Sequence, residues 1–556
     1  MKPSVAFVGA GPTTIYTLHA LLETAPGPFS LTIFEEQASA GRGTPYRPGW
    51  NDPAMLSNIA SIEIPPLVDS LVDWLRDQPR DRLTELGVDP TNIGERTFYP
   101  RLALGAFFHA QFEALLDQAR ALGADVQVKT RCRVLDAQST AQGITLKIRH
   151  RSNQSLKQTF NHVVLATGHQ WPEQPEVRPG YFLSPWPASA LATIAPCHVG
   201  IRGTSLTAID ATVALAVAHG EFVEREDGTM AYMPAPNTDG FRITMMSRKG
   251  LLPEADFYGP LPYEPLAIFT PEAADALIGA PDGALLDQAF SLFRQELLTA
   301  DPGYAAKLHV ADLSIEEFHD RYFEDRANAD PFVWAEANLR EAQRNYEAKY
   351  TVPWRYAILR MHEVMARLIP YLEQDDFKRF SRYFKPIFVD DYATVPHKSI
   401  KRMIALHKAG KLEIVAIGDE YRIDSHRPEG GATVTAGENT FSFPVFIEAT
   451  GQRALQARDF PFKSLLRQGI VRDVDPSAQG GSSRGIVIDD EFHPVADDIP
   501  VDQLFCLSLP FILGRHPFIQ GITSSHEMGQ VVGQQLAKAI DRDLERSSKT
   551  NLASAT

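Results

Sequence analysis

The first thirty-five residues constrain the fold of this 556-residue chain more than any other stretch. An apolar run at 4–8 leads into the turn GAGPTT at 9–14, which is followed by a helical pattern of apolar residues and a second apolar run at 31–34. A strand, a glycine-rich turn, a helix and a strand in this order form half of a βαβ unit that binds dinucleotides. The sequence therefore predicts an α/β protein that begins in a dinucleotide-binding domain.

The residue types in this unit match the chemistry of a pyrophosphate site. Gly9 allows the tight turn, and Gly11 lets the backbone approach a pyrophosphate. The helix that starts at Pro12 and Thr13 offers free N–H groups and positive potential to phosphate oxygens. Glu35 lies about 20 residues past the turn, where a carboxylate accepts hydrogen bonds from a ribose. We therefore expect these five residues to bind a dinucleotide.

The third glycine of the usual fingerprint is replaced by Thr14. We expect the helix and the strand to pack slightly farther apart as a result, because the side chain needs room. The alternative interpretation is a glycine-rich turn in another kind of α/β protein.

The composition limits the class of partner. Fifty-four basic and 69 acidic residues give a net charge of −15, which argues against a nucleic-acid or anionic-membrane partner. Cys132, Cys197 and Cys506 form no CxxC pair, so we expect neither a disulfide scaffold nor a metal site. No run approaches the ~20 apolar residues of a membrane span, and no signal peptide opens the sequence. We expect a soluble, cytoplasmic protein of two or three domains.

Several later stretches are candidates for contact with a bound cofactor. The loop GRGTPY at 41–46 has glycines that would let backbone lie close to a ligand, although an ordinary surface loop is the alternative. An apolar strand ends in Ala166-Thr167-Gly168-His169, and a second ATG turn at 449–451 follows about 280 residues later. Near the C-terminus, Gly521 and Ile522 precede a helix whose N–H groups could face a phosphate or a flavin carbonyl.

The strand–turn–helix pattern begins again at 199–211, after a proline-rich linker at 172–197. Its glycine fingerprint is incomplete, because the three glycine positions are occupied by Gly203, Ser205 and Ala208. We expect the turn from Gly203 through Thr204 to Ser205 to form a second dinucleotide site.

The next strand, at 242–246, ends in Ser247-Arg248-Lys249 instead of an acid. A basic cluster at this position accommodates a 2′-phosphate, whereas an acid would bind the 2′-hydroxyl of NAD. The sequence therefore favours NADPH, bound in part by Ser247 and Arg248. The competing interpretation is that Arg248 and Lys249 are solvated loop charges.

The stretch from about 253 to 384 is helical in pattern and rich in aromatic residues, and it is too long for a connection within a plain βαβ unit. We expect a helical insertion that covers the cleft and selects the substrate. The alternative is a dimerisation module or a structural subdomain. The sequence is also compatible with a homo-oligomer. The polar tail at 546–556 is expected to be disordered.

Together these motifs resemble the flavoproteins with two dinucleotide-binding domains, and more narrowly the bacterial FAD/NAD(P)-binding proteins of the YdhS type. The motifs that carry the resemblance are GAGPTT at 9–14, GRGTPY at 41–46, ATGH at 166–169, RGTSLTAID at 202–210, SRKGLLP at 247–253 and EATG at 448–451. Class B flavin monooxygenases and amino-acid N-hydroxylases share this plan.

The resemblance implies two Rossmann-like domains, one of them split. The FAD domain would comprise 1–196 and 453–545, and the NAD(P)H domain 197–452 with the helical insertion at about 253–384. By similarity, Gly9, Gly11, Glu35 and Arg42 would bind FAD, with Thr167, Gly168, Gly451, Gly521 and Ile522 as further cofactor contacts. Gly203, Ser205 and Arg248 would bind the nicotinamide cofactor.

The function expected from this plan is an FAD- and NADPH-dependent oxidoreductase. We favour a monooxygenase, in one version N-hydroxylating, that acts on a small polar metabolite and dioxygen through a C4a-hydroperoxyflavin. Asn58 and His169 are the candidate catalytic hydrogen-bond donors, with Arg202 or Arg248 near the pyridine nucleotide. The alternatives are a reductase that passes electrons to a protein or quinone, and a non-catalytic FAD-binding protein.

Overall fold

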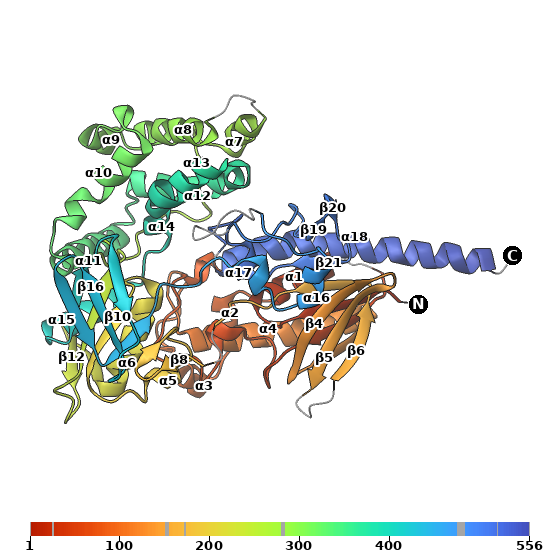
Figure 1. Cartoon of the computed structure of the whole chain (residues 1–556), viewed down its shortest axis with the longest axis horizontal. Coiled ribbons are helices and arrows are strands. Elements are labelled where there is room, and N and C mark those ends of the chain that lie inside the picture. The colour runs from red at the N-terminus through yellow and green to blue at the C-terminus, as the bar shows by residue number, and fades with distance from the viewer. Residues whose placement is uncertain are drawn as a thin grey trace. The chain divides into compact units, whose positions relative to one another are not determined.

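The chain divides into two compact units, each of which is assembled from separate stretches of sequence (Figure 1). The computed structural model describes all residues except 1, 25–26, 151–154, 172–173, 280–283, 475–483, 520 and 555–556. The first unit comprises Met1–Pro48, Ile59–Gln170 and Gln452–Thr556, and the second comprises Gly49–Asn58 and Trp171–Gly451.

The first unit is built on a five-stranded parallel sheet in the order β21-β7-β1-β2-β3. The strands are β1 (Ser4–Val8), β2 (Ser30–Phe34), β3 (Asp125–Lys129), β7 (His162–Leu165) and β21 (Leu504–Cys506). In chain order this is the 3-2-1-4-5 arrangement of a dinucleotide-binding sheet. β1 lies in the middle, and its apolar residues are almost completely buried, as a strand with neighbours and helices on all sides requires.

Three helices accompany this sheet, namely α1 (Pro12–Glu23), α4 (Arg101–Ala121) and α18 (Ile522–Ser554). A three-stranded antiparallel sheet of β4 (Cys132–Thr140), β5 (Gly143–His150) and β6 (Ser155–Phe160) is inserted before β7.

α1 and α18 pack unusually closely because α18 presents two glycines to α1. A Cβ at Gly529 would lie 2.8 Å from backbone atoms of Tyr16 and Thr17, and one at Gly533 would lie 2.6 Å from the Cβ of Ala20. Since each Cβ would clash, this contact of the two backbones requires glycine at both positions. α18 runs on to Ser554, so the disordered tail expected from 546 is helical up to that residue.

In the second unit, the strands β14, β13, β10 and β18 repeat the 3-2-1-4 part of this sheet order. Its six-stranded sheet runs β14-β13-β10-β18-β9-β8, and the first four strands are parallel. The strands are β8 (Glu176–Arg178), β9 (Tyr181–Phe182), β10 (His198–Arg202), β13 (Arg242–Ser247), β14 (Leu412–Ala416) and β18 (Val445–Glu448). α6 (Leu206–His219) follows β10 as α1 follows β1.

The strands β8 and β9 explain a difference from the expected domain boundary. We expected the first domain to run to 196, but the second unit begins at Trp171, because β9 pairs in parallel with β18 and β8 pairs with β9. The proline-rich stretch that reads as a linker therefore extends the second sheet.

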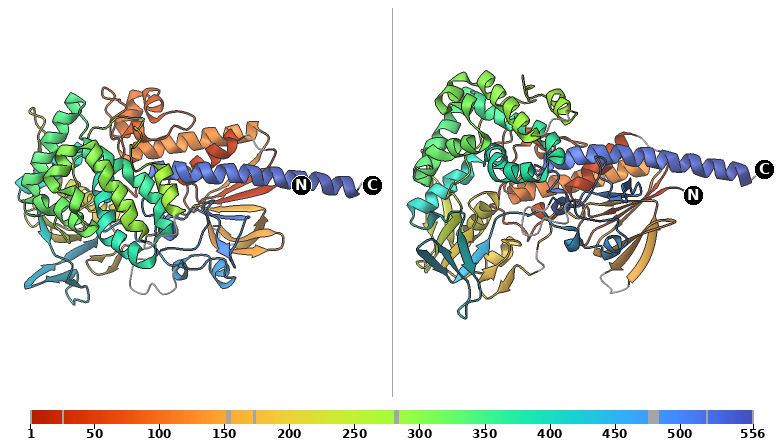
Figure 2. Two further views of the ribbon diagram at one scale, coloured as in Figure 1. Left: turned by 90° about the horizontal axis from the view of Figure 1, so that it is seen from above. Right: turned by 45° about the horizontal axis from the view of Figure 1, so that its top comes forward.

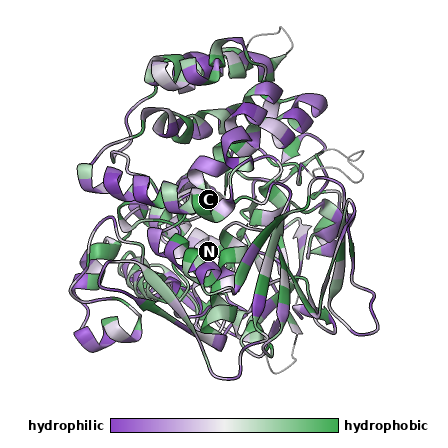
Figure 3. Cartoon of the chain, turned by 90° about the vertical axis from the view of Figure 1, so that its left-hand side faces the viewer, coloured by the Kyte–Doolittle hydropathy of each residue, from purple (hydrophilic) through white to green (hydrophobic). Residues whose placement is uncertain are grey.

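The second unit also carries the helical insertion, which we define as the helices from α7 to α14. They are α7 (Pro271–Ile278), α8 (Leu285–Ala300), α9 (Pro302–Leu308), α10 (Ile315–Ala327), α11 (Pro331–Ala348), α12 (Pro353–Leu368), α13 (Gln374–Arg379) and α14 (Lys385–Tyr392), and α15 (His397–Lys408) follows. Both views of Figure 2 show these helices gathered as one group. Figure 3 shows hydrophilic and hydrophobic residues alternating along them, as expected of helices that bury one face.

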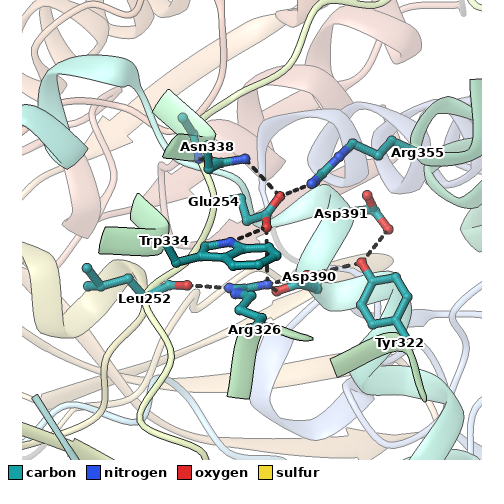
Figure 4. Close-up of polar contacts among 10 residues, drawn as sticks. Leu252, Glu254, Tyr322, Arg326, Trp334, Asn338, Arg355, Asp390 and Asp391 are labelled. Atoms are coloured by element: carbon teal, nitrogen blue, oxygen red, sulfur yellow. Dashed lines mark hydrogen bonds and ion pairs between the residues drawn. The ribbon is translucent and has the colours of Figure 1, made fainter. Parts of the chain in front are cut away.

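A buried cluster of charges fixes the insertion to the segment that follows β13 (Figure 4). Glu254 on that segment is 4% exposed; it accepts hydrogen bonds from Trp334 Nε1 at 2.9 Å and Asn338 Nδ2 at 3.1 Å and pairs with Arg355. Burial acts against the charge of Glu254, but Arg355 and Arg326 lower the pKa of its carboxyl below the usual range.

Arg326 connects the same segment to α14. Its guanidinium donates to the carbonyl oxygen of Leu252 and to Asp390, where the two contacts are 2.7 and 2.8 Å. Arginine suits this place because its planar group can serve two acceptors at once.

Asp391 is a second, almost completely buried carboxyl group beside this cluster. The hydroxyl of Tyr322 lies 3.1 Å from Oδ2 of Asp390 and 3.1 Å from Oδ2 of Asp391. The hydroxyl can donate its single proton to either of these oxygens. Burial raises the pKa of Asp391 well above its usual range, which favours its neutral form. Glu254 and Asp390 then balance Arg326 and Arg355.

We expect the neighbours Asp390 and Asp391 to respond in opposite ways to substitution by Asn. Asp390→Asn leaves Glu254 to face two buried arginines, Arg326 at 3.7 Å and Arg355, and should cost about 3–5 kcal/mol of stability. Asp391→Asn keeps a neutral group of the same size beside Tyr322. Because the pKa of Asp391 is raised in the folded protein, wild-type stability falls as pH rises above the usual carboxyl range, and the variant should not share this loss.

Urea unfolding of the second unit, followed through the fluorescence of Trp334 and Trp354, measures both effects. The two variants should be compared with the wild type at pH 5 and pH 8. An Asp391→Asn protein destabilised as strongly as Asp390→Asn at both values would show that Asp391 is ionised.

Candidate functional site: two dinucleotide turns

In both units, a backbone carbonyl lies so close to the first glycine of the turn that no side chain fits there. Gly9 has a φ of +106°, and a Cβ there would overlap the carbonyl oxygen of Ala166. Gly203 has a φ of +129°, and a Cβ there would overlap the carbonyl oxygen of Ala449. Each ATG turn therefore lies directly against the first fingerprint glycine of its own unit, in a place that only glycine can occupy.

In the first unit the loop at 41–46 closes over the fingerprint turn. Gly41 N donates to Ala10 O at 2.9 Å, and a Cβ at Gly11 would meet Gly43 Cα at 3.3 Å. Arg42 is thus held beside the turn. No described side chain caps the N-terminus of α1, which begins one residue after Gly11, so its N–H groups remain available to an anion.

Glu35 lies at the end of β2, next to the same turn. Its Oε2 accepts from Ala10 N at 3.3 Å, and its Oε1 accepts from Gln37 N at 2.8 Å. Burial raises the pKa of Glu35, and the two backbone N–H groups oppose this shift. A carboxylate fixed in this way can bind a ribose hydroxyl with its remaining lone pairs.

The start of α18 adjoins the start of α1. Gly521 has a φ of +145°, Ile522 is buried, and the hydroxyls of Thr13 and Ser525 lie 3.1 Å apart. The first unit brings together the predicted residues Gly9, Gly11, Pro12, Thr13, Glu35, Arg42, Thr167, Gly168, Gly521 and Ile522. Glycines without room for a Cβ, an uncapped helix start and a fixed carboxylate fit the pyrophosphate and ribose of a dinucleotide.

The two candidate catalytic residues belong to different units. His169 is in the first unit, where burial and the charge of Arg101 lower the pKa of its imidazole to about 4. It is therefore neutral near pH 7. Asn58 is exposed and is part of the second unit.

The stretch Gly49–Asn58 belongs to the second unit and not, as expected, to the first domain. Met55 is 2% exposed in the core of that unit, and Arg402 Nη1 donates to the carbonyl oxygen of Ala54 at 2.6 Å. The apolar residues Trp50, Ala54 and Met55 within this loop were the available signal.

In the second unit the predicted residues also gather around the turn. α6 begins after Ser205, and no described side chain caps it. Thr204 Oγ1 donates to Ser247 Oγ at 3.0 Å, and Ser247 Oγ accepts from Gly250 N at 3.1 Å. Gly451, in the second ATG turn, has a φ of +78°. This arrangement joins the ends of β10 and β13, where a second dinucleotide would lie.

Arg202 has a partner that the sequence analysis missed. Its Nε lies 2.5 Å from Glu448 Oε2, Tyr181 Oη donates to Glu448 Oε1 at 2.8 Å, and Arg202 Nη1 donates to Tyr421 Oη at 3.3 Å. The pair joins the ends of β10 and β18. Arg202, a candidate cofactor donor, is therefore engaged within the protein; the signal was Glu448 directly before the second ATG turn.

Arg248 and Lys249 have different environments. Arg248 is exposed, and its Nη1 lies 3.5 Å from Asp419 Oδ1. Lys249 Nζ lies 2.9 Å from His319 Nε2 and 3.6 Å from the ring centre of Phe323, and burial together with Arg248 lowers its pKa to about 8. Of the predicted basic cluster, only Arg248 is open to a ligand.

Asp489, Glu491 and His493 place one possible metal-ligand atom each within 4.8 Å of one another. Asp489 Oδ1 accepts from the backbone N–H groups of the other two residues, so these hydrogen bonds also stabilise the turn.

Among the described helices, none has the length and apolar character needed to cross a membrane.

Comparison with known proteins agrees with this geometry. A family model described as FAD-NAD(P)-binding matches residues 6–170, and one described as a YdhS-like middle domain matches residues 270–392. The uncharacterized protein YdhS of Escherichia coli (strain K12) is 40% identical over 545 residues, which cover 98% of this chain and 99% of the relative. These matches confirm the predicted resemblance and the predicted FAD and NAD(P) cofactors.

Several solved structures align with most of this chain at low identity and with TM-scores below 0.5. Ornithine hydroxylase from Pseudomonas aeruginosa is 12% identical, with a TM-score of 0.49 and coverage of 97% of this chain and 99% of that chain. Ornithine N-hydroxylase from Kutzneria sp. 744 is 14% identical, with a TM-score of 0.49 and coverage of 98% and 100%. Bacillithiol disulfide reductase from Bacillus cereus is 11% identical, with a TM-score of 0.43 and coverage of 97% and 99%.

We expect Gly11→Val to abolish FAD binding while the protein still folds. The new side chain would stand where the backbone approaches the pyrophosphate, but the nearest atoms to its Cβ would be Gly43 Cα at 3.3 Å and Gly43 N at 3.9 Å. The measurement is the ratio of FAD to protein after purification, together with the melting temperature.

Gly279→Val is the matched control, because Gly279 has a φ of −79° and a Cβ there would meet only carbonyl oxygens at 3.8 Å. This variant should keep its flavin. A Gly11→Val protein with a full complement of FAD would place the cofactor elsewhere.

Proposed function

We propose that this chain, which belongs to the YdhS family of FAD/NAD(P)-binding proteins, is an FAD- and NADPH-dependent oxidoreductase. The observation that supports the proposal most strongly is the repeated turn. Gly9 lies against the carbonyl oxygen of Ala166 in one unit, and Gly203 lies against that of Ala449 in the other. Two such turns provide one dinucleotide site for the flavin and one for the nicotinamide cofactor.

The assignment of the two sites follows from their acidic and basic groups. The first turn keeps both early glycines and has Glu35 beside it, which suits the ribose of FAD. The second turn has Arg248, exposed, at the end of β13 in place of an acid, which suits the 2′-phosphate of NADPH.

The finer activity that we propose is monooxygenation of a small polar metabolite, N-hydroxylation being one form of it. When bound, FAD would take hydride from NADPH and supply a reduced ring able to react with dioxygen. The protein would hold the two cofactors, exclude water and provide hydrogen-bond donors, of which His169 and Asn58 are the candidates. His169 suits this role because a neutral imidazole can donate from one nitrogen and accept at the other.

The purified protein is expected to be yellow, and NADPH should bleach its flavin absorption in the absence of oxygen. In air, a monooxygenase would consume NADPH and hydroxylate its substrate, whereas a reductase would pass the electrons to an added quinone or protein. Stopped-flow absorption spectra measure the first step. A flavin that NADPH does not reduce would instead identify a non-catalytic FAD-binding protein.

Arg248→Ala should raise the KM for NADPH about tenfold or more and leave that for NADH nearly unchanged, because a charge-assisted contact to the 2′-phosphate is lost. Steady-state kinetics with both cofactors provide the internal control. Equal losses for NADPH and NADH would assign Arg248 a different role.

A further inference from the structure

The helical insertion contributes a second arginine at the end of β13. Arg382 Nη2 lies 3.8 Å from Asp419 Oδ2, and Arg248 Nη1 lies 3.5 Å from Oδ1 of the same carboxylate. The side chains are 61% exposed for Arg248 and 63% exposed for both Arg382 and Asp419. Two guanidinium groups from distant parts of the sequence thus meet at one accessible carboxylate.

We propose that Arg382 of the helical insertion is a second determinant of NADPH specificity and binds the 2′-phosphate together with Arg248. The inference rests on the proposed use of NADPH and adds to it a role for the insertion. Asp419 holds the two arginines near each other until the phosphate replaces it.

The position of the three residues in the fold supports this assignment. Arg248 directly follows β13, and Asp419 lies just after β14, the neighbouring parallel strand. The two loops are joined by hydrogen bonds from Ile417 N to Ser247 O and from Gly418 N to Arg248 O, both 3.0 Å. Ligands of open α/β sheets bind outside the carboxyl ends of such strands.

The balance of charge favours an anion with more charge than a carboxylate. Two guanidinium groups face one carboxylate, which leaves a net positive charge in a chain whose total is −15. The contacts of 3.5 and 3.8 Å are longer than charge-assisted hydrogen bonds of about 2.7–2.9 Å. Exposed pairs of this kind are weak, so a phosphate with a charge near −2 and three acceptor oxygens can displace Asp419.

The backbone around Arg382 is also unusual. Residues Phe380–Phe384 form a π-helical turn between α13 and α14, and the rings of Phe380 and Phe384 are completely buried. π-Helical turns are rare and occur frequently at functional sites. The two buried rings fix this turn in the core of the insertion and leave Arg382 on its exposed side.

Lys249 is not the second cation. Its ammonium lies over the ring of Phe323 and is bonded to His319, and burial lowers its pKa to about 8. A group so engaged is a poorer partner for phosphate than the exposed Arg382.

Calorimetric titration of the FAD-loaded protein with 2′,5′-ADP and with 5′-AMP tests the proposal, because the two probes differ only in the 2′-phosphate. Arg382→Ala should weaken the binding of 2′,5′-ADP about tenfold and leave 5′-AMP unchanged. Asp419→Asn should strengthen the binding of 2′,5′-ADP. Arg340→Ala is the matched control, since Arg340 is also on the insertion, is 63% exposed and pairs with Glu336.

The outcomes distinguish a failure of the role assigned to Arg382 from a failure of the proposed use of NADPH. If Arg248→Ala loses preference for 2′,5′-ADP and Arg382→Ala does not, the insertion takes no part and the proposed use of NADPH stands. If neither variant changes the preference, the 2′-phosphate is not bound here and the proposed use of NADPH fails as well. Equal weakening of both probes by Arg382→Ala would make Arg382 structural and overturn the inference.

Discussion

The structure of both units depends on one steric constraint, the contact of a glycine with the end of a neighbouring strand. Ala166 and Ala449 each direct a carbonyl oxygen into the space that a Cβ would fill, at Gly9 and Gly203. The same strand ends are joined by hydrogen bonds from Ala166 N to Val8 O at 2.9 Å and from Ala449 N to Arg202 O at 2.8 Å. Because β1 meets β7 and β10 meets β18 in this way, each glycine turn has little freedom to move.

Much of this could be predicted from sequence, because the determinants of a glycine turn are local. The turn at 9–14, the two ATG turns and Arg248 all lie within a few residues of a strand end. The unpredicted features depend on pairing between distant segments. Strand β9 belongs to the second sheet only because it pairs with β18, and Met55 reveals its place only when packed in the core of the second unit. Arg382 could not be connected with Arg248, since more than a hundred residues separate them.

The buried charges of the insertion show a further limit of sequence reasoning. Glu254, Arg326, Arg355 and Asp390 come from three helices and one extended segment, and none lies in a recognisable motif. Their balance also depends on Asp391, because burial raises the pKa of its carboxyl, and composition cannot reveal that shift. Such a cluster is costly to form with any partner missing, so it favours a single arrangement of the insertion on the second unit. An insertion held in one arrangement can present Arg382 at a defined place.

The division of the chain between the two units determines how the protein responds to truncation and to proteolysis. The backbone passes from one unit to the other four times, after Pro48, Asn58, Gln170 and Gly451. Neither unit is therefore a contiguous fragment that a truncated gene could encode. A protease that cuts one of these passages leaves the units covalently joined through the other three, so nicked protein would keep its halves together in the absence of denaturant.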